Sequence, residues 1–255
     1  MSQKMKWTIY SLLIIIVLTA VFVIRYKVEY DSENHTEEQP KISIQDLIAT
    51  NPTNWKQTLF DTTYTKNESV IENIQPDITD NELMYKYTHS KYFTEFDDLG
   101  RCGMVYAFID EAIMPADGEK RESIGMVKPS GWHTYKFPDK ISDLYLYNRC
   151  HLLGWQLTRE NANELNLITG TRNLNLTMLK YENQIRDFVL NSDEKVLLVV
   201  EPLFKDNELV ARYLCINAVS TANGKITDSL NIDIVIPNIQ EGIAINYATG
   251  EATEN

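Results

Sequence analysis

One histidine of this chain stands where a catalytic base would be useful. His151 directly follows an apolar, aromatic run that reads as a strand, and an asparagine-rich segment, residues 166–175, leads from it toward a helix. A neutral imidazole accepts a proton from water, and a downstream Asn oxygen can hold a hard cation beside a phosphate group. This order of residues is typical of a one-metal site that hydrolyses phosphodiesters.

The segments that must position these residues alternate between strands, turns and one long helix. Apolar and β-branched runs predict strands near the end of 99–109 and at 124–128, 144–147, 195–204, 209–219 and 230–236. The strand at 144–147 is expected to lead into a loop that carries His151. Turns are expected at 129–131, 206–207 and 223–224.

Apolar spacing of three and four residues predicts a helix over 178–190, and a short amphipathic helix is expected over 42–50. The residues from Gly250 onward read as a frayed end.

The charge of the chain is unevenly distributed. The formal net charge is −12, which argues against a protein that coats nucleic acid non-specifically. Residues 119–186 nevertheless carry ten Lys/Arg against seven Asp/Glu. A locally basic face on an acidic protein suits brief contact with a polyanion.

Three cysteines, Cys102, Cys150 and Cys215, are too few and of the wrong parity for a disulfide framework. Two alternatives stay open: a Cys102–Cys150 pair in a domain outside the cell, or three small buried residues. No His/Cys cluster has the spacing of a zinc site.

Residues 7–24 form an uncharged apolar stretch near the N-terminus. As a helix these 18 residues would span about 27 Å, close to a bilayer core of roughly 30 Å. The stretch has no clear small-x-small cleavage site, so we expect a retained single-span anchor rather than a signal peptide. The expected organisation is a membrane anchor at 1–27, a polar tether or variable segment at 28–75 and a catalytic domain at 76–250.

Several motifs, in order, resemble the DNA/RNA non-specific endonucleases of the ββα-metal (His-Me) finger class. The likeness covers roughly residues 76–250 and is nearest to members found in Gram-positive bacteria, which include membrane-bound DNA-entry nucleases. It depends on LGRCG at 99–103, SIGMVKPSGWH at 123–133, YNRCHLLGWQLT at 147–158, NLITGTRNLN at 166–175, YEN at 181–183 and NYATGE at 246–251. The resemblance implies an α+β fold with a central, mostly antiparallel sheet and a ββα-metal finger motif, here preceded by the transmembrane helix.

The resemblance also implies roles for individual residues. His151 matches the general base, Asn175 the main protein ligand of Mg²⁺, and Asn166 a second asparagine of the site. Glu182 matches a helix glutamate that holds metal-bound water, and Arg149 matches an arginine that positions or neutralises phosphate. Mg²⁺ is the expected cofactor, with Mn²⁺ as an alternative.

Two features depart from the family pattern. Asn148 stands where the family often has Asp, which removes a charge near the metal, and the spacing from Asn175 to Glu182 is one residue shorter than expected. Further candidate phosphate contacts are Arg121, Lys128, Arg172 and Lys180. Packing or surface roles are expected for the remaining histidines, His35, His89 and His133.

We therefore expect a metal-dependent endonuclease that cleaves DNA, and RNA as well, without sequence or sugar specificity, because phosphate contacts position a substrate without reading its bases. Its expected location is the cell membrane, with a single span and the nuclease domain outside, where the chromosome is absent. Two alternatives remain: a DNA-binding receptor with the nuclease fold and little or no activity, and an antibacterial nuclease toxin. Partners other than DNA, RNA and the membrane are not indicated.

Overall fold

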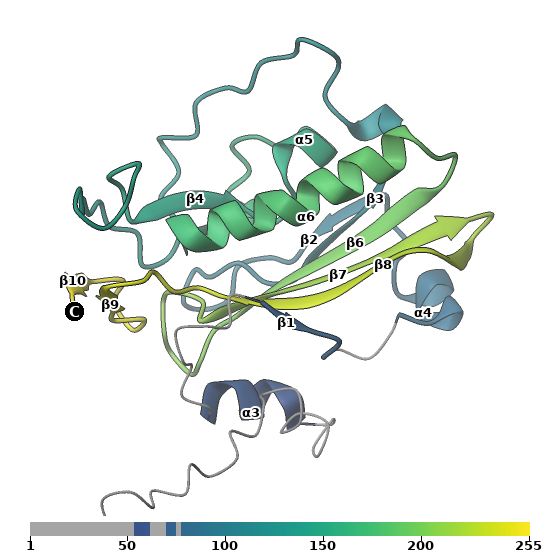
Figure 1. Cartoon of the computed structure of the whole chain (residues 1–255). Helices are drawn as coiled ribbons and strands as arrows, with labels where there is room; N and C mark the ends of the chain where they lie inside the picture. Colours follow the sequence, from purple (N-terminus) through teal and green to yellow (C-terminus); the bar gives the residue numbers. More distant parts are fainter. Residues whose placement is uncertain (1–53, 62–69, 75–77) are drawn as a thin grey trace, which may run out of the picture. The chain divides into compact units, whose positions relative to one another are not determined.

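The computed structural model describes residues 54–61, 70–74 and 78–255, and its largest element is a six-stranded sheet (Figure 1). The strands lie in the order β1-β8-β7-β6-β3-β2, and every neighbouring pair is antiparallel. Their bounds are Ile71–Glu72 (β1), Lys91–Phe93 (β2), Val105–Ile109 (β3), Lys195–Leu203 (β6), Tyr213–Ala222 (β7) and Lys225–Pro237 (β8). The predicted α+β class with a large antiparallel sheet is confirmed.

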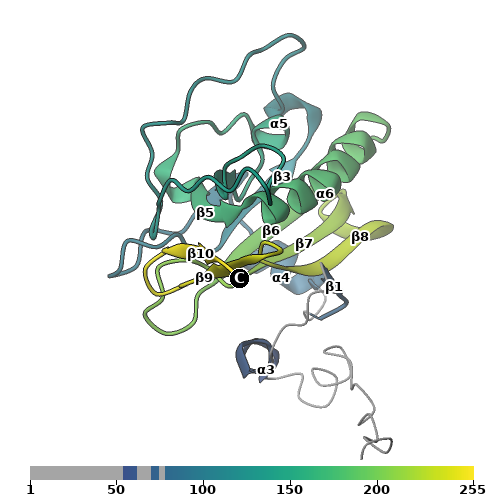
Figure 2. The same cartoon turned by 60° about the vertical axis from the view of Figure 1, so that its left-hand side comes forward.

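Helix α6, Arg172–Leu190, covers one face of this sheet, and Figures 1 and 2 both show it running along the strands. Its buried side chains recur every three or four residues, which gives the helix one apolar side; they are Leu174, Met178, Tyr181, Ile185 and Val189. They pack with alternate residues of β3, β6, β7 and β8 in the main hydrophobic core.

Two short helices cover the opposite face. Helix α4, Asp80–Tyr85, contributes Leu83 to a cluster with the intervening residues of β3 and β6. Helix α3, Trp55–Asp61, packs against β7 and β8, and the hydroxyl of Tyr213 donates to the carbonyl of Leu59 at 2.9 Å. The folded region therefore begins before residue 76, because α3 and β1 lie inside the segment expected to be a tether.

A separate two-stranded sheet leads directly into α6. Strand β4, Tyr147–His151, pairs antiparallel with β5, Leu167–Thr171, and His151 lies opposite Leu167. Helix α5, Trp155–Thr158, and a 3-10 turn at Glu164–Asn166 connect the two strands. Thr171 ends β5 and caps α6 by accepting from the backbone N–H of Leu174 at 3.0 Å. The order β4-β5-α6 is the expected ββα element.

The end of the chain is ordered rather than frayed, so that prediction was wrong. Strand β10, Ala252–Glu254, pairs with β9, Ile243–Ile245. Gly250, with a φ of 85°, lies so close to Gly131 that a Cβ would meet the Gly131 carbonyl oxygen. Its own carbonyl accepts from the Tyr147 hydroxyl at 3.0 Å. The residues of this segment are ordinary turn residues, so the sequence pattern did not predict their close contact with β4.

Several predicted elements differ in the structure. Residues 124–128 form a turn instead of a strand, because the carbonyls of Gly125 and Val127 accept from the Arg149 guanidinium and not from a neighbouring strand. Residues 209–212 precede β7 as a loop, in which the N–H groups of Leu209 and Val210 both donate to the Tyr247 carbonyl. Helix α6 begins at residue 172 rather than 178. His151 lies at the end of β4 rather than in a loop.

The predicted membrane span at 7–24, the acidic part of the tether at 28–45 and the short helix at 42–50 all lie outside the described residues. Among residues 54–61, 70–74 and 78–255, no helix is long and apolar enough to cross a membrane. The three cysteines are free and buried. Cys102 has its thiol directed at the carbonyls of Glu164 and Leu167, so the reading as small buried residues describes this structure.

Candidate active site

The imidazole of His151 is buried, and both of its nitrogens have partners. Nε2 lies 2.7 Å from the backbone carbonyl of Asn161, and Nδ1 lies 3.2 Å from Nη2 of Arg121. Because a carbonyl oxygen can only accept, Nε2 carries the hydrogen and Nδ1 presents the lone pair. The ring is therefore held in one neutral tautomer with its basic nitrogen toward Arg121.

Burial lowers the pKa of His151 to about 4, the hydrogen bond to Asn161 opposes that change, and the positive charge of Arg121 adds to it. A histidine with this pKa is uncharged at neutral pH and can accept a proton.

His151 opens into a cavity of about 290 Å³, here called the His151 pocket. Four other residues predicted for the site, from three different segments, line the same cavity: Arg121, Arg149, Asn175 and Glu182. The first comes from the 116–122 loop, the second from β4 and the last two from α6. Residues more than sixty positions apart in the sequence thus meet at one place.

Asn175 and Glu182 lie seven residues apart on α6, which is close to two helical turns. Both therefore point to the same side of the helix, next to the stripe that packs on the sheet. The spacing that departs from the family pattern still brings both side chains to the His151 pocket. The Asn175 amide is half-buried and makes no hydrogen bond within the part of the chain that the structure describes.

The Glu182 carboxylate is confined by neighbours on both sides. A Cβ at Gly154 would lie 2.5 Å from its carboxyl carbon, so a side chain at this position would displace the carboxylate. Nε2 of Gln156 donates to its Oε2 at 3.2 Å, and Nη1 of Arg186 donates to Oε1 of Gln156 at 3.0 Å. Burial raises the pKa of Glu182, while Gln156 and the charge of Arg121 act in the opposite direction.

Gln156 was not predicted to belong to the site. Arg186 fixes which end of its amide faces Glu182, because the guanidinium can only donate and so selects the Gln156 oxygen. The sequence offered only its place in the motif at 147–158, and in the structure it lies on α5. Its contact with α6 depends on the fold.

Asn166 is fully buried and does not line the His151 pocket. Its side chain holds Leu153 from both sides, accepting from the Leu153 N–H at 2.8 Å and donating to the Leu153 carbonyl at 2.9 Å. Its own carbonyl accepts from the N–H of Leu152 at 2.9 Å. Asn166 therefore fixes the turn that follows His151 and places Gly154 against Glu182.

A second cavity of about 500 Å³ adjoins the first and is here called the arginine cavity. It shares Arg121, Arg149 and Asn175 with the His151 pocket, and Arg172 lines its far part. Arg149 is held by the carbonyls of Gly125 and Val127, and its guanidinium lies 4.0 Å from the centre of the Trp132 ring. Arg149 is thus fixed in place where the two cavities adjoin.

The remaining candidates lie elsewhere. Lys128 and Lys180 are exposed and line neither cavity. Nε2 of His133 lies 3.1 Å from the Thr249 carbonyl, in agreement with a packing role. His35 lies outside the described residues.

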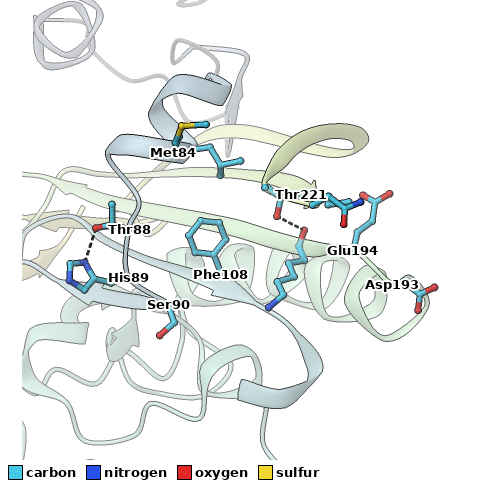
Figure 3. Close-up of a pocket in the computed structure, with 13 residues that line it drawn as sticks. Met84, Thr88, His89, Ser90, Phe108, Asp193, Glu194 and Thr221 are labelled. Atoms are coloured by element: carbon cyan, nitrogen blue, oxygen red, sulfur yellow. Dashed lines mark hydrogen bonds between the residues drawn. The ribbon is translucent and has the colours of Figure 1, made fainter.

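A larger cavity, of about 1020 Å³, lies on the other side of the sheet (Figure 3). It is bordered by α4, the start of β2 and the turns that follow α6 and β7. Two of the side chains that line it have partners: Nδ1 of His89 contacts the Thr88 hydroxyl at 3.2 Å, and Lys195 pairs with Asp110 at 2.6 Å. This cavity is larger than the His151 pocket, but none of the residues predicted for the site lines it.

The donors of the His151 pocket suit a hard divalent cation held by few protein ligands. Asn175 offers an amide oxygen that no described group occupies, and Glu182 offers a carboxylate on the same side of α6. Mg²⁺ prefers oxygen ligands and keeps several waters, so it does not need a protein cage. Among the described residues there is no group of three or more His, Cys, Asp and Glu side chains that could form such a cage.

Comparisons with known proteins bear on the family and the fold of this chain. The model of the DNA/RNA non-specific endonuclease family matches residues 63–222, more than half of the chain. The fold is similar to that of NucA from Streptococcus agalactiae without metal, with a TM-score of 0.62 and 22% identity over 83% of this chain and 97% of that one.

Two further solved structures share the fold. NucA with a magnesium ion gives a TM-score of 0.55 and 24% identity, covering 66% of this chain and 80% of that one. The Sda1 nuclease with a zinc ion gives 0.55 and 22%, covering 74% and 92%. At these identities the likeness shows the fold alone.

Proposed function

Because this chain belongs to the DNA/RNA non-specific endonuclease family, we propose that it is a metal-dependent endonuclease that hydrolyses DNA and RNA without reading sequence. The observation that carries the proposal is the His151 pocket, where a neutral imidazole with a fixed tautomer faces the free amide of Asn175. Base and metal ligand come from the two ends of one ββα element, so their relative position is set by β4, β5 and the start of α6.

In the proposed reaction, Nδ1 of His151 takes a proton from the attacking water as the water oxygen bonds to phosphorus. The bond from phosphorus to the 3′ oxygen then breaks, which leaves a 5′-phosphate, and the departing oxygen takes a proton from solvent water to become a 3′-hydroxyl. The imidazolium then returns its proton to solvent. The Asn161 carbonyl stabilises the imidazolium that forms, because it accepts the Nε2 hydrogen throughout. The chain thus supplies both the base and the group that orients it.

The Arg121 guanidinium can donate to either of two acceptors. Without substrate it donates to Nδ1 of His151 at 3.2 Å, where it occupies the lone pair that the reaction needs. A phosphate in the pocket is a stronger, charged acceptor, and it would draw the guanidinium away from the ring. We infer that substrate binding frees the base, while Arg149 stays in place on Trp132 and the two backbone carbonyls.

Asn175 would hold the cation directly and Glu182 through a bound water. When bound, Mg²⁺ would neutralise charge at the phosphate and at the departing 3′ oxygen. Gln156 and Gly154 keep the Glu182 carboxylate on the side of the pocket, and Asn166 keeps Gly154 there. Magnesium is proposed as the natural ion, with manganese as an alternative; solved proteins of this fold hold magnesium in one case and zinc in another.

The proposed location is the outer face of the cytoplasmic membrane. The support is the uncharged 7–24 stretch and the argument that a sequence-blind nuclease is tolerable only away from the chromosome. Protease added to intact protoplasts should remove the domain, and membrane fractions should carry the activity. A domain that survives protease in intact protoplasts would reverse the topology.

One rival function has a specific observation in its favour. Asn148 replaces a family aspartate and lines the arginine cavity, as it would in a receptor that binds nucleic acid and cleaves it poorly. A plasmid-degradation assay of the full chain, with Mg²⁺ and with EDTA, separates the two. A nuclease degrades the plasmid with Mg²⁺ only, and His151→Ala stops cleavage while binding continues. A receptor retards the plasmid in both conditions and leaves it intact.

A further inference from the structure

The arginine cavity has a composition that catalysis in the His151 pocket does not require. Three arginines, Arg121, Arg149 and Arg172, line it, and none of its lining side chains is acidic. In a chain with a net charge of −12, such a concentration of positive charge calls for an anion. The volume of about 500 Å³ falls in the range of roughly 300–1,000 Å³ that is common for small organic ligands.

Arg172 is only partly paired. Its guanidinium forms an ion pair with Asp143, which stands outside the cavity lining. Its Nε is buried and has no hydrogen-bond partner among the residues that the structure describes. An unpaired buried donor costs free energy unless a ligand satisfies it, so Arg172 has capacity left for a phosphate.

The lining of this cavity is also partly aromatic. Trp132 and Tyr145 both line it; Trp132 is covered by Arg149, and Tyr145 is 44% exposed. Nζ of Lys136 lies over the Tyr145 ring, 5.0 Å from its centre, which leaves the other face of the ring as a surface on which a nucleobase can stack.

The backbone that presents Tyr145 is strained. Leu144 has a φ of 70°, in the left-handed region that a bulky side chain rarely adopts. It separates Asp143, the partner of Arg172, from Tyr145, whose N–H donates to the Asp143 carbonyl at 2.8 Å. This one turn therefore positions both Asp143, the partner of Arg172, and the Tyr145 ring. Backbone strain of this kind persists where the surrounding structure holds it in place.

We propose that the arginine cavity binds the nucleotide next to the cleaved phosphate, with its base on Tyr145 and its phosphate on Arg172. The proposal rests on the nuclease function and names its preferred substrate. In a duplex the faces of the bases are stacked on one another, so a base reaches Tyr145 only from a single strand or an unpaired position. The enzyme therefore favours single-stranded over double-stranded nucleic acid.

The test uses the full chain purified in detergent. Binding is measured with the His151→Ala form, in Mg²⁺, by fluorescence anisotropy of a labelled 12-nucleotide strand and of the same strand in a duplex. Cleavage of both is measured with the intact site. Tyr145→Ala is added in each background, with Tyr145→Phe as the conservative variant and Tyr85→Ala as the control, because Tyr85 is 77% exposed on α4, away from both cavities.

Tyr145→Ala should weaken binding of the single strand by at least about fivefold, the lower end of what one lost base–aromatic stack gives, and leave duplex binding nearly unchanged. Tyr145→Phe should bind like the parent, and so should Tyr85→Ala. Arg172→Ala should weaken single-strand binding as well. Equal losses for strand and duplex, or no loss with Tyr145→Ala, would overturn the subsite. If the parent cleaves neither substrate with Mg²⁺, the nuclease function itself fails, which is a different result.

Discussion

The hydrogen bond from Nε2 of His151 to the carbonyl of Asn161, at 2.7 Å, decides which imidazole nitrogen is the base. It leaves the lone pair on Nδ1, where Arg121 lies 3.2 Å away. The base of this site is thus oriented by one backbone group and covered by one side chain, and both influence when it can accept a proton.

The rate should lose half its value well below pH 6.5 as the solution is acidified. The folded-state pKa of His151 is lowered to about 4, so the neutral form persists until the pH approaches that value, whereas an unperturbed histidine titrates at about 6.5. The measurement is the single-turnover rate at saturating Mg²⁺, with circular dichroism at each pH as the control for folding.

Glu182 also contributes to the loss of rate at low pH. Burial raises the pKa of its carboxyl group, and the protonated form lacks the negative charge that acts near the metal. Glu182→Gln should leave only the contribution of His151 to this loss of rate. Arg121→Ala should move the loss of rate to higher pH, because it removes a positive charge. A Glu182→Gln enzyme whose rate halves at or above pH 6.5 would contradict the geometry of a buried neutral base.

Asn175→Ala should raise the Mg²⁺ concentration needed for half-maximal activity and lower the maximal rate, since it removes the proposed direct ligand. Glu182→Gln should shift the same titration by less, because it is proposed to act through water. The measurement is a Mg²⁺ titration of plasmid cleavage. A titration curve identical to the parent's for Asn175→Ala would assign the cation to other groups.

Gln156→Leu should raise the Mg²⁺ concentration needed for half-maximal activity, as Glu182→Gln does, with the unfolding temperature little changed. The lost contact is the 3.2 Å hydrogen bond that orients the Glu182 carboxylate, and Leu fills a similar volume. Gln184→Leu is the matched control, because Gln184 is exposed on α6, the helix that carries Glu182. Arg186→Ala frees the Gln156 amide to rotate and should give a smaller shift. Equal behaviour of the Gln156 and Gln184 variants would remove Gln156 from the site.

Much of the site could be predicted because its main residues sit in one continuous ββα element. His151 ends β4, and Asn175 lies in the first turn of α6, so motif order alone placed them together. The start of α6 was missed since Asn173 and Asn175 resemble turn residues, whereas the Thr171 cap begins a helix there.

What the sequence could not reveal depends on contacts between distant segments. The 124–128 segment has the composition of a strand, but Arg149 takes the carbonyls that a strand partner would need. Gln156 contacts Arg186, which is thirty residues away in the sequence, and no local sequence pattern predicts that contact. Lys128 and Lys180 have the right charge for phosphate but point away from the cavities, because residue type does not fix direction on a loop or helix.

Asn166→Ala should destabilise the fold as well as lower activity, which separates a positioning role from a chemical one. It leaves the N–H and carbonyl of buried Leu153 unpaired, at a cost of about 1–3 kcal/mol. That corresponds to a fall in unfolding temperature of at least about 2 °C for a domain of this size. Asn231→Ala, at an exposed position on β8, is the control. Loss of activity at an unchanged unfolding temperature would mean that Asn166 takes part in the reaction directly.

Metal and nucleic acid should bind cooperatively. The His151 pocket is lined by two guanidinium groups, of Arg121 and Arg149, and by a single carboxylate, so a divalent cation entering alone meets net positive charge. A phosphate reverses that balance.

With the His151→Ala form, which cannot cleave, calorimetry should show Mn²⁺ binding at least about fivefold tighter when a single-stranded oligonucleotide is present. By linkage, Mn²⁺ should tighten oligonucleotide binding by the same factor. Asn175→Ala should abolish the coupling, while Arg121→Ala should strengthen binding of the metal alone. Identical Mn²⁺ affinity with and without the oligonucleotide would show that the pocket itself provides all the charge that the cation needs.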